Sequence, residues 1–327
     1  MLSYIVRRTL YMIPTLLLIS IVSFLVIQLQ PGDILSEYRL NPRINQETLN
    51  RMAQQLGVDQ PIHRRYWKWL VTMVTKPYEV RSIHPESGER PVLLLFWERL
   101  PATLLVTLPT FLFAWLLSIP IGIYSALRQY SLGDHVFTFL GFLGLATPNF
   151  FLALLLMYIL AVYFGAGSVG GLSSSQYISA PWSWAKFVDY LQHVWVAVVV
   201  LGTGTMAGLI RYTRGNMLDI LGAPYVQTAR SKGLAERIVI YKHALRNAVN
   251  PLISIFGLSL PGLFSGALIT VIVLNIPSVE LQLYQSLLQK DEYVVMTFLM
   301  LLAFLLQLAN LLADIMLAWV DPRIRYD

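Results

Sequence analysis

The chain has 327 residues, of which 56% are hydrophobic and 13% carry a charged side chain. An ordinary soluble domain has about a quarter of its residues charged, so this composition excludes one. The chain contains no cysteine, which excludes disulfides and cysteine-ligated metals. The net charge of +6 requires no nucleic-acid partner, because the membrane topology inferred below accounts for it.

Six apolar runs are long enough to cross a hydrocarbon core of about 30 Å as helices. They are Leu10–Leu29, Ala102–Tyr124, Val136–Phe164, Val194–Ile210, Leu252–Ile276 and Val294–Val320. Helices are expected because backbone exposed to lipid has to satisfy its hydrogen bonds internally. The sequence therefore predicts an all-α polytopic membrane protein with six transmembrane helices.

The first apolar run follows Arg7 and Arg8, as the core of a cleaved signal peptide would. Its 20 residues exceed the roughly 7–15 of such a core, and no small-x-small cleavage site follows it. We therefore expect a retained helix.

The segment 31–100 resembles soluble protein, with ten basic and eight acidic residues. Short helices are predicted at Gln46–Leu56 and Ile62–Val74, the second with an apolar or interfacial face formed by Tyr66, Trp67, Trp69 and Leu70. The segment is either a small cap on the membrane surface or a docking surface for an external protein, and the sequence leaves both readings open.

The predicted spans carry almost no ionisable side chain. The first five have none in their interiors, and the sixth has Asp314 near its cytoplasmic end. Proton-driven transporters and cation channels commonly need buried acids, so the pattern argues against use of an ion gradient. Sodium coupling through backbone carbonyls stays open.

The fourth span contains Gly202, Gly204 and Gly208, a spacing that superficially resembles a dinucleotide loop. No strand precedes these glycines, so the spacing predicts close helix packing instead. The chain also has no phosphate-binding loop, and its five histidines lack metal-ligand spacing. We expect no catalytic residue, no metal site and no nucleotide hydrolysis by this chain.

A charged interruption at Arg211–Pro251 holds seven of the 24 basic residues and two acids. Within it, Pro224 suits the first position of a helix and Gly233 the position after its end, which predicts a helix about 14 Å long. A second helix is expected from about Ala235 to Val249, and Pro251 should mark the turn into the fifth span. A basic amphipathic helix on the inner leaflet is the alternative for the second helix.

Lys and Arg concentrate in short cytoplasmic loops, which predicts the orientation. With both termini in the cytoplasm, twelve basic residues fall in cytoplasmic segments, whereas the short outer loops hold Lys186 and Lys290. The other ten lie in residues 31–100, a segment long enough to be exempt from the rule. We therefore expect an extracytoplasmic segment at 31–100.

Several motifs resemble those of ABC-transporter permeases of the dipeptide, oligopeptide and nickel importer class. They are Tyr225–Leu234 (YVQTARSKGL), His243–Pro251 (HALRNAVNP), Tyr4–Arg8 (YIVRR), Pro31–Asp33 (PGD) and Arg99–Leu104 (RLPATL). The resemblance implies the type I ABC importer permease fold. It divides the chain into a cytoplasmic tail with the first transmembrane helix (1–30), an extracytoplasmic segment (31–100), a permease core (101–320) with a cytoplasmic coupling loop (211–251), and a cytoplasmic tail (321–327).

In this family an E-A-A-x-x-x-G motif forms a coupling helix that docks on the ATPase subunit. Here Gln227, Thr228 and Ala229 take the E-A-A positions and Gly233 that of the glycine, so an amide replaces the acid. The implied coupling residues are Pro224, Tyr225, Val226, Gln227, Thr228, Ala229, Arg230, Ser231, Lys232, Gly233 and Leu234.

The resemblance implies a multi-pass permease of the cytoplasmic (inner) membrane that imports di- or oligopeptides. Its partners would be a homologous second permease, two ATP-binding subunits, an extracytoplasmic solute-binding protein and membrane lipid, without nucleic acid. ATP and Mg would be used by the ATPase subunits, and this chain would bind no cofactor. Nickel or glutathione-like solutes are the alternative cargo. An ATP-independent secondary transporter or channel, or a membrane scaffold or receptor, is an alternative of another class.

Overall fold

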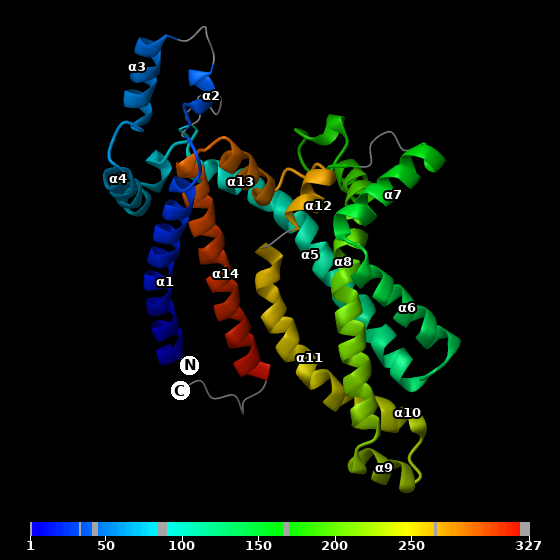
Figure 1. Ribbon diagram of the computed structural model, residues 1–327. Coiled ribbons are helices and arrows are strands. Elements are labelled where there is room, and N and C mark those ends of the chain that lie inside the picture. Colours follow the sequence, from blue (N-terminus) through cyan, green and yellow to red (C-terminus); the bar gives the residue numbers. More distant parts are fainter. Residues whose placement is uncertain are drawn as a thin grey trace. The chain divides into compact units, whose positions relative to one another are not determined.

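The computed structural model describes residues 2–32, 34–40, 45–83, 90–165, 170–264 and 267–320 (Figure 1). The regular structure of these ranges is helical, apart from an isolated antiparallel bridge between Arg81 and Pro91. Five helices are long and apolar enough to cross a membrane, or up to six if one bent pair counts as a span. The predicted all-α polytopic architecture is confirmed. The tail predicted at 321–327 lies outside the described residues.

Four of the predicted spans correspond to single long helices. They are α1 (Leu2–Gln28), α5 (Val92–Leu127), α8 (Trp184–Leu221) and α14 (Glu292–Val320). Each begins before its apolar run, and α5 and α8 also continue past the end of theirs, because helical hydrogen bonding does not stop where polar residues start. For α8 this means that the predicted loop at Arg211–Pro251 is helical over its first eleven residues.

The third predicted span, Val136–Phe164, is wrong as a continuous helix. It consists of α6 (Leu132–Ala146) and α7 (Asn149–Phe164), whose axes are bent by 106°. Thr147 between them has an extended backbone, with φ −93° and ψ 122°. Pro148 is the physical reason, since its ring disfavours the helical conformation of the preceding residue and its nitrogen donates no hydrogen bond.

The fifth predicted span also differs. A continuous segment from Glu236 to Phe264 comprises α10 (Glu236–Ile238), a π-helical stretch (Val239–Leu245), α11 (Arg246–Ser259) and a 3₁₀ stretch (Leu260–Phe264). Pro251 therefore lies inside α11 and does not mark a turn; in a membrane helix a proline is tolerated because neighbouring groups satisfy the freed carbonyl. The end of the predicted span forms the separate short helix α12 (Leu268–Val273).

The chain divides into two compact units. The first unit comprises the described parts of 1–103 and 277–311, and the second those of 104–276 and 312–326. The first unit holds α2 (Ser36–Arg39), α3 (Gln46–Leu56), α4 (Ile62–Thr75), a 3₁₀ turn (Pro77–Glu79) and α13 (Val279–Leu288) in addition to parts of the long helices. The second also holds a 3₁₀ turn (Ser175–Tyr177) and α9 (Pro224–Ser231).

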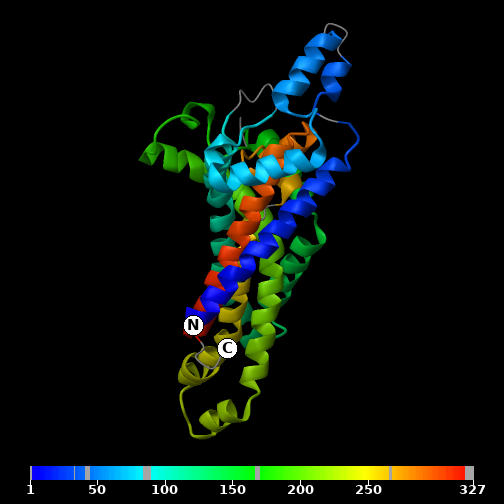
Figure 2. The ribbon, with the colours of Figure 1, turned by 90° about the vertical axis from the view of Figure 1, so that its left-hand side faces the viewer.

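In the first unit α4 lies across α1 and the start of α14 (Figure 2). Trp69 is buried and its Nε1 donates to Thr297 Oγ1 at 3.0 Å, while the Tyr66 hydroxyl lies 2.9 Å from Ser20 Oγ. Both predicted short helices are confirmed to within one residue. Of the predicted apolar or interfacial face, Trp69 is buried, whereas Trp67 is 64% exposed, because residues two apart on a helix point in nearly opposite directions.

A buried ion pair joins three helices of the first unit. Glu292, at the start of α14, accepts hydrogen bonds from Arg65 Nε at 2.9 Å and from Gln28 Nε2 at 2.8 Å. Arg65 Nη2 bonds the second carboxylate oxygen, so the pair is bidentate. The side chains of Arg65 and Glu292 are 13% and 4% exposed. This cluster therefore ties α1, α4 and α14 together.

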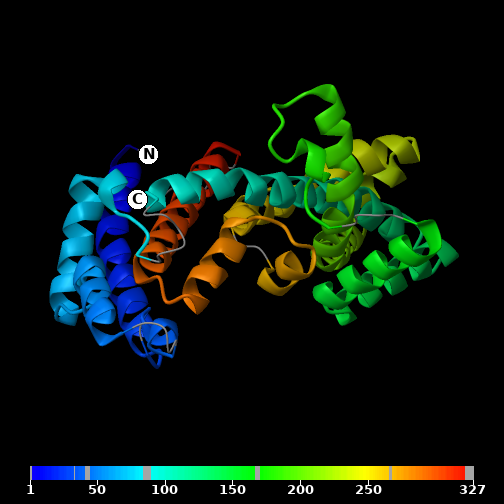
Figure 3. The same ribbon diagram turned by 90° about the horizontal axis from the view of Figure 1, so that it is seen from above.

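In the second unit α6 and α7 lie beside α8 (Figure 3). A Cβ added at Gly202 of α8 would come within 2.7 Å of Phe113 Cδ1, which confirms the predicted close packing there. A Cβ added at Gly204 would have one neighbouring atom, at 3.8 Å, and a Cβ added at Gly208 would meet no atom within 4 Å. The small-residue prediction thus holds for Gly202 alone among these three described glycines.

Replacing Glu292 by alanine should lower the free energy of unfolding by about 3–5 kcal/mol, because Arg65 would remain buried without its counter-charge. Thermal unfolding of the purified protein in detergent measures the change. Glu47→Ala is the matched control, since it removes an exposed pair with Arg51 that contributes about 0.3–0.5 kcal/mol. The double variant Arg65→Met/Glu292→Leu should recover most of the loss. Equal destabilisation by Glu292→Ala and Glu47→Ala would contradict this reading.

Candidate coupling site

The helix α9 starts and stops as its sequence predicts. Ala223 precedes it with an extended backbone (φ −67°, ψ 144°), and Pro224 occupies the first helical position, where no backbone N–H is needed. At the other end Gly233 has φ +73°, in the left-handed region. The Gly233 N–H donates to the Arg230 carbonyl at 2.9 Å and the Leu234 N–H to the Ala229 carbonyl at 3.4 Å. This pair of bonds is a Schellman motif, which satisfies the last carbonyls of the helix.

The helix α9 lies beside the end of α8 (Figure 1), and one of its faces is buried against its own chain. Val226 is fully buried and Ala229 is 6% exposed. They belong to an apolar cluster, here called the α9 cradle, whose other buried members are Ala126, Met217, Val239, Ala244 and Ala248. An isolated helix this short is marginal in water, so the cradle supplies the order that α9 lacks by itself.

Side-chain hydrogen bonds fix the same helix from its polar side. Gln227 Nε2 donates to the carbonyl of Gly222, at the end of α8, at 3.1 Å. A carboxylate at this position would have no hydrogen to donate, so the amide suits the contact better than the acid of the E-A-A pattern. Thr228 Oγ1 and Ser231 Oγ each donate to the carbonyl four residues earlier, at 2.8 and 3.1 Å.

An ion pair closes the turn after α9. Arg230 Nη2 donates to Glu236 Oε1 at 2.7 Å, and Arg230 Nε lies 3.2 Å from both carboxylate oxygens. The hydrogen bond to Glu236 raises the pKa of the Arg230 guanidinium. Arg230 thus holds α9 and α10 together and keeps its charge.

A π-helical stretch, Val239–Leu245, forms one wall of the cradle. Val239 and Ala244 point into the cradle and are fully buried. One turn later Asn247 Nδ2 donates to the Tyr225 hydroxyl at 3.0 Å. π-helical turns are rare and occur frequently at functional sites, which marks this segment as part of the site.

The outer face of α9 and its continuation expose both apolar and basic side chains. Tyr225, Leu234, Ile238 and Tyr241 are 43%, 39%, 45% and 67% exposed. The exposed basic residues between and around them are Lys232, Arg237 and Lys242. Of the predicted coupling residues, Val226 and Ala229 face the cradle; the exposed ones are Pro224, Tyr225, Gln227, Thr228, Arg230, Ser231, Lys232, Gly233 and Leu234.

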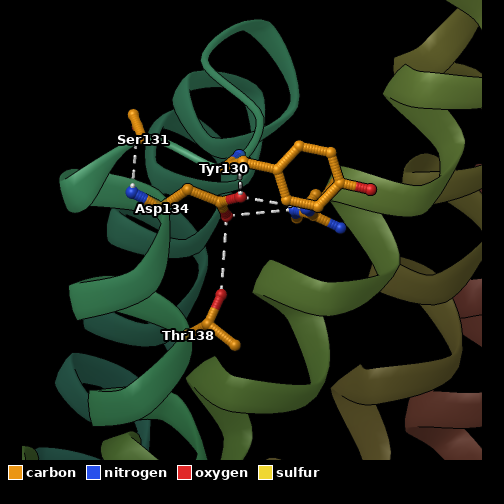
Figure 4. A network of polar contacts seen from close by, with 5 residues as sticks. Tyr130, Ser131, Asp134 and Thr138 are labelled. Atoms are coloured by element: carbon orange, nitrogen blue, oxygen red, sulfur yellow. Dashed lines mark hydrogen bonds and ion pairs between the residues drawn. The ribbon is translucent and has the colours of Figure 1, made fainter.

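The sequence did not predict an ion pair near the same end of α8, in which the carboxylate is buried and the arginine is 27% exposed (Figure 4). Asp134 of α6 is 2% exposed and accepts hydrogen bonds from Arg214 Nε at 3.1 Å and Nη2 at 3.0 Å. The Tyr130 N–H also donates to this carboxylate at 3.0 Å, and Ser131 Oγ caps α6 by accepting from the Asp134 N–H. Arg214 falls in the predicted loop at Arg211–Pro251, whereas the structure places it in α8. Eighty residues separate the partners, so no local pattern links them.

Among the residues that the structure describes, no group of three or more His, Asp or Glu side chains is placed to hold a metal ion. The fold and the site together define a polytopic integral membrane protein that presents a short, pre-ordered helix on the polar segment between two spans.

The chain belongs to the family of binding-protein-dependent transport system inner membrane components. The family model matches residues 118–326, and the model of the family's N-terminal region matches residues 1–107. The chain is therefore a permease component of an ABC transport system and not its catalytic subunit. Such a system includes an ATPase and a binding protein as partners of the permease.

Several characterised relatives match along their whole length. The oligopeptide transport system permease protein AppB of Bacillus subtilis is 39% identical over 326 residues, covering 100% of both chains. The di/tripeptide permease protein DppB of Pseudomonas aeruginosa is 32% identical over 342 residues, covering 100% of this chain and 99% of the relative. The glutathione transport system permease protein GsiC of Salmonella typhi is 30% identical, again over 100% of both chains.

Replacing Gly233 by valine should destabilise the end of α9. A Cβ at this position would meet no atom within 4 Å, so the cost of about 1–2 kcal/mol comes from the left-handed backbone itself. Hydrogen exchange at the amides of residues 233 and 234 should accelerate roughly tenfold. Gly222→Ala is the control because Gly222 has φ −79°, which any residue adopts. Gly233→Asn should exchange more slowly than Gly233→Val, since asparagine tolerates the left-handed region. Unchanged exchange in Gly233→Val would contradict the assignment.

Proposed function

We propose that this chain is one of two homologous permease subunits of an ATP-driven peptide importer and that α9 is its docking element for an ATPase subunit. The observation that carries the proposal is α9 itself. Its apolar face is buried in the cradle, its Pro and Gly boundaries are well defined, and its outer face is exposed. A helix ordered by its own chain, with its other face exposed, is suited to receive a partner without an ordering cost.

The proposed orientation puts both termini and α9 in the cytoplasm. Lys and Arg in the short loops support it, since twelve fall on that side and two on the other. Residues 1–30 then hold a cytoplasmic tail and the first span, 31–100 lie on the extracytoplasmic side of the membrane, 101–320 form the permease core with the coupling loop at 211–251, and 321–327 form the second tail. The extracytoplasmic segment is the proposed docking region for the solute-binding protein.

In the proposed cycle, ATP binding closes the two ATPase subunits and moves α9 with them. The motion passes to α8, because the Gln227 amide bonds the Gly222 carbonyl and Met217 packs in the cradle. Alternation between inward- and outward-facing states is then a population shift driven by the different nucleotide affinities of the two states.

The cargo that we propose is a di- or oligopeptide. The matched relatives are named for oligopeptides, di- and tripeptides, and glutathione. Glutathione is itself a tripeptide, so a peptide-like solute is common to all three names. Which peptide is accepted would be decided largely by the binding protein.

The test is ATP-dependent uptake of a radiolabelled tripeptide into vesicles. Uptake should require this chain together with the second permease, the two ATPases and the binding protein. Uptake by this chain alone, indifferent to ATP, would overturn the proposal in favour of a secondary transporter or channel.

Replacing Thr228 by tryptophan should abolish ATPase docking while the protein still inserts and folds. Thr228 is exposed on α9, and its hydroxyl bonds only the carbonyl of Pro224 among the contacts described, so a large side chain obstructs the partner and not the cradle. Co-purification of the ATPase with the permease and ATP-dependent uptake are the measurements, and both should fall at least tenfold. Thr75→Trp is the matched control for the co-purification, because Thr75 on α4 is also exposed, makes the same bond to the carbonyl four residues earlier, and lies in the segment proposed to be extracytoplasmic. Normal docking in Thr228→Trp would place the ATPase contact elsewhere.

A further inference from the structure

The second unit contains a partly open cavity of about 270 Å³ between its helices. Its walls come from α5, from α8 and from the end of α11 with the 3₁₀ stretch that follows. On α5 the lining runs from Thr107 to Trp115, and on α8 it includes Leu201 and Thr205. These positions lie in the middle of the apolar runs predicted as the second and fourth spans, so the cavity belongs to the membrane interior.

Two polar atoms in the cavity lining are buried without a hydrogen-bond partner among the described residues. They are the Trp115 indole Nε1 and the Thr107 hydroxyl. Trp115 is 5% exposed. A buried donor without a partner is costly, and such groups are uncommon in folded proteins. The lining therefore presents a donor, at Trp115, and a donor or acceptor, at Thr107, that the chain itself leaves unused.

The Trp115 ring is held in place by other aromatic rings. Its centroid lies 5.9 Å from that of Phe111 and 5.1 Å from that of Phe256, the latter at an interplanar angle of 75°. Phe111 and Phe256 also contact each other edge to face, at 5.1 Å. These two ring contacts restrict rotation of the indole.

Two breaks in the helices meet the same cavity. Asn149, which lines it, is the first residue of α7 after the 106° bend, and Ser259 and Gly262 line it where α11 passes into the 3₁₀ stretch. Non-helical backbone at membrane depth is tolerated where it lines a cavity, and discontinuous helices commonly form the substrate sites of transporters. The third and fifth predicted spans are therefore broken at positions that line this cavity.

The cavity lining carries no ionisable side chain among the described residues, but it offers several neutral hydrogen-bonding groups. Its hydroxyls and the Asn149 carboxamide can both donate and accept, whereas the indole N–H only donates. A peptide backbone presents carbonyl acceptors and N–H donors in the same neutral form whatever its side chains are. The lining therefore matches the part of a peptide that does not vary with sequence.

We propose that this cavity is a backbone-binding subsite on the peptide's path, in which the Trp115 N–H donates to a peptide carbonyl and the Thr107 hydroxyl bonds another amide of the same peptide. The proposal rests on the peptide-importer function proposed above. It explains how one permease transports peptides of differing sequence. The subsite hydrogen-bonds the amide groups that all peptides share, and the apolar aromatic wall contacts side chains without selecting among them.

The first test compares uptake of a tripeptide with uptake of its depsipeptide analogue. In the analogue one amide is replaced by an ester, which lacks the N–H and has a weaker carbonyl acceptor. The complete importer is used with the same binding protein throughout, so the preference of the binding protein cancels between permease variants. Thr107→Val removes the hydroxyl with little change in volume, and Trp115→Phe removes the indole N–H while it keeps an aromatic ring. Each should lower tripeptide uptake roughly three- to tenfold and shrink the tripeptide-to-depsipeptide ratio by a similar factor.

Trp184→Phe is the matched control, since Trp184 is 78% exposed at the start of α8 and does not line the cavity. It should change neither uptake nor the ratio. A loss of uptake in Trp115→Phe and Thr107→Val with an unchanged ratio would mean that the two groups serve packing or bind water, and would overturn the subsite.

A second test uses the absence of cysteine from the chain. Thr205→Cys places one thiol in the cavity lining, at an exposed position of α8. Gly208→Cys places one about a turn further along α8, outside the lining and with open space for a side chain. In the assembled importer, tripeptide should slow maleimide labelling at position 205 at least threefold and leave labelling at 208 unchanged. Equal protection at both positions, or at neither, would overturn the proposal.

These outcomes separate the subsite from the function on which it rests. If the complete importer takes up peptide in an ATP-dependent way but both cavity variants leave the tripeptide-to-depsipeptide ratio unchanged, the importer function stands and the proposed subsite is wrong. ATP-independent uptake by the chain alone removes both.

Discussion

The structure of the second unit depends on one constraint: a helix inside a bilayer has to satisfy all its backbone hydrogen bonds within itself. The helix α8 meets it without interruption over 38 residues, which corresponds to a length of about 57 Å against a hydrocarbon core of about 30 Å. It therefore extends well beyond the core. Along its length it carries Thr205 in the cavity, Arg214 in the ion pair with α6, Met217 in the cradle, and the Gly222 carbonyl that Gln227 bonds.

The ion pair between Asp134 and Arg214 holds this end of α8 against α6, in addition to the packing of Met217 in the cradle. Without it, the polar end of α8 would be held mainly by apolar contacts, which are not directional. A bidentate Arg–carboxylate pair adds a defined geometry, so it fixes α6 against α8 at a particular register. In the proposed cycle, a displacement of α9 would pass to α8 and from there, through the ion pair, to the bent pair of α6 and α7. Asn149, at the bend, lines the cavity.

What could be predicted from the sequence divides between local and long-range causes. The limits of α9 were predictable because Pro224 fixes its own φ and Gly233 adopts a positive φ, both properties of single residues. The bend at Pro148 was not, since Pro14, Pro109, Pro120 and Pro251 all lie inside helices and local sequence does not say which proline breaks one. The partners of Asp134, the burial of Val226 and the unpaired Trp115 N–H each depend on residues distant in sequence. The six apolar runs were predictable from composition, but the breaks within the third and fifth runs were not.

The cradle also indicates which contacts a partner of α9 can make. Gln227 is neutral and already donates to Gly222, and the Arg230 guanidinium is already paired with Glu236, so neither supplies a free charge at the centre of the helix. Exposed apolar area remains instead at Tyr225, Leu234, Ile238 and Tyr241. Tyrosine is enriched where interfaces hold most of their binding energy, because it combines a large rigid surface with a polar tip. Docking on this face would therefore rest on shape and apolar contact, with Lys232, Arg237 and Lys242 contributing to partner choice and association rate.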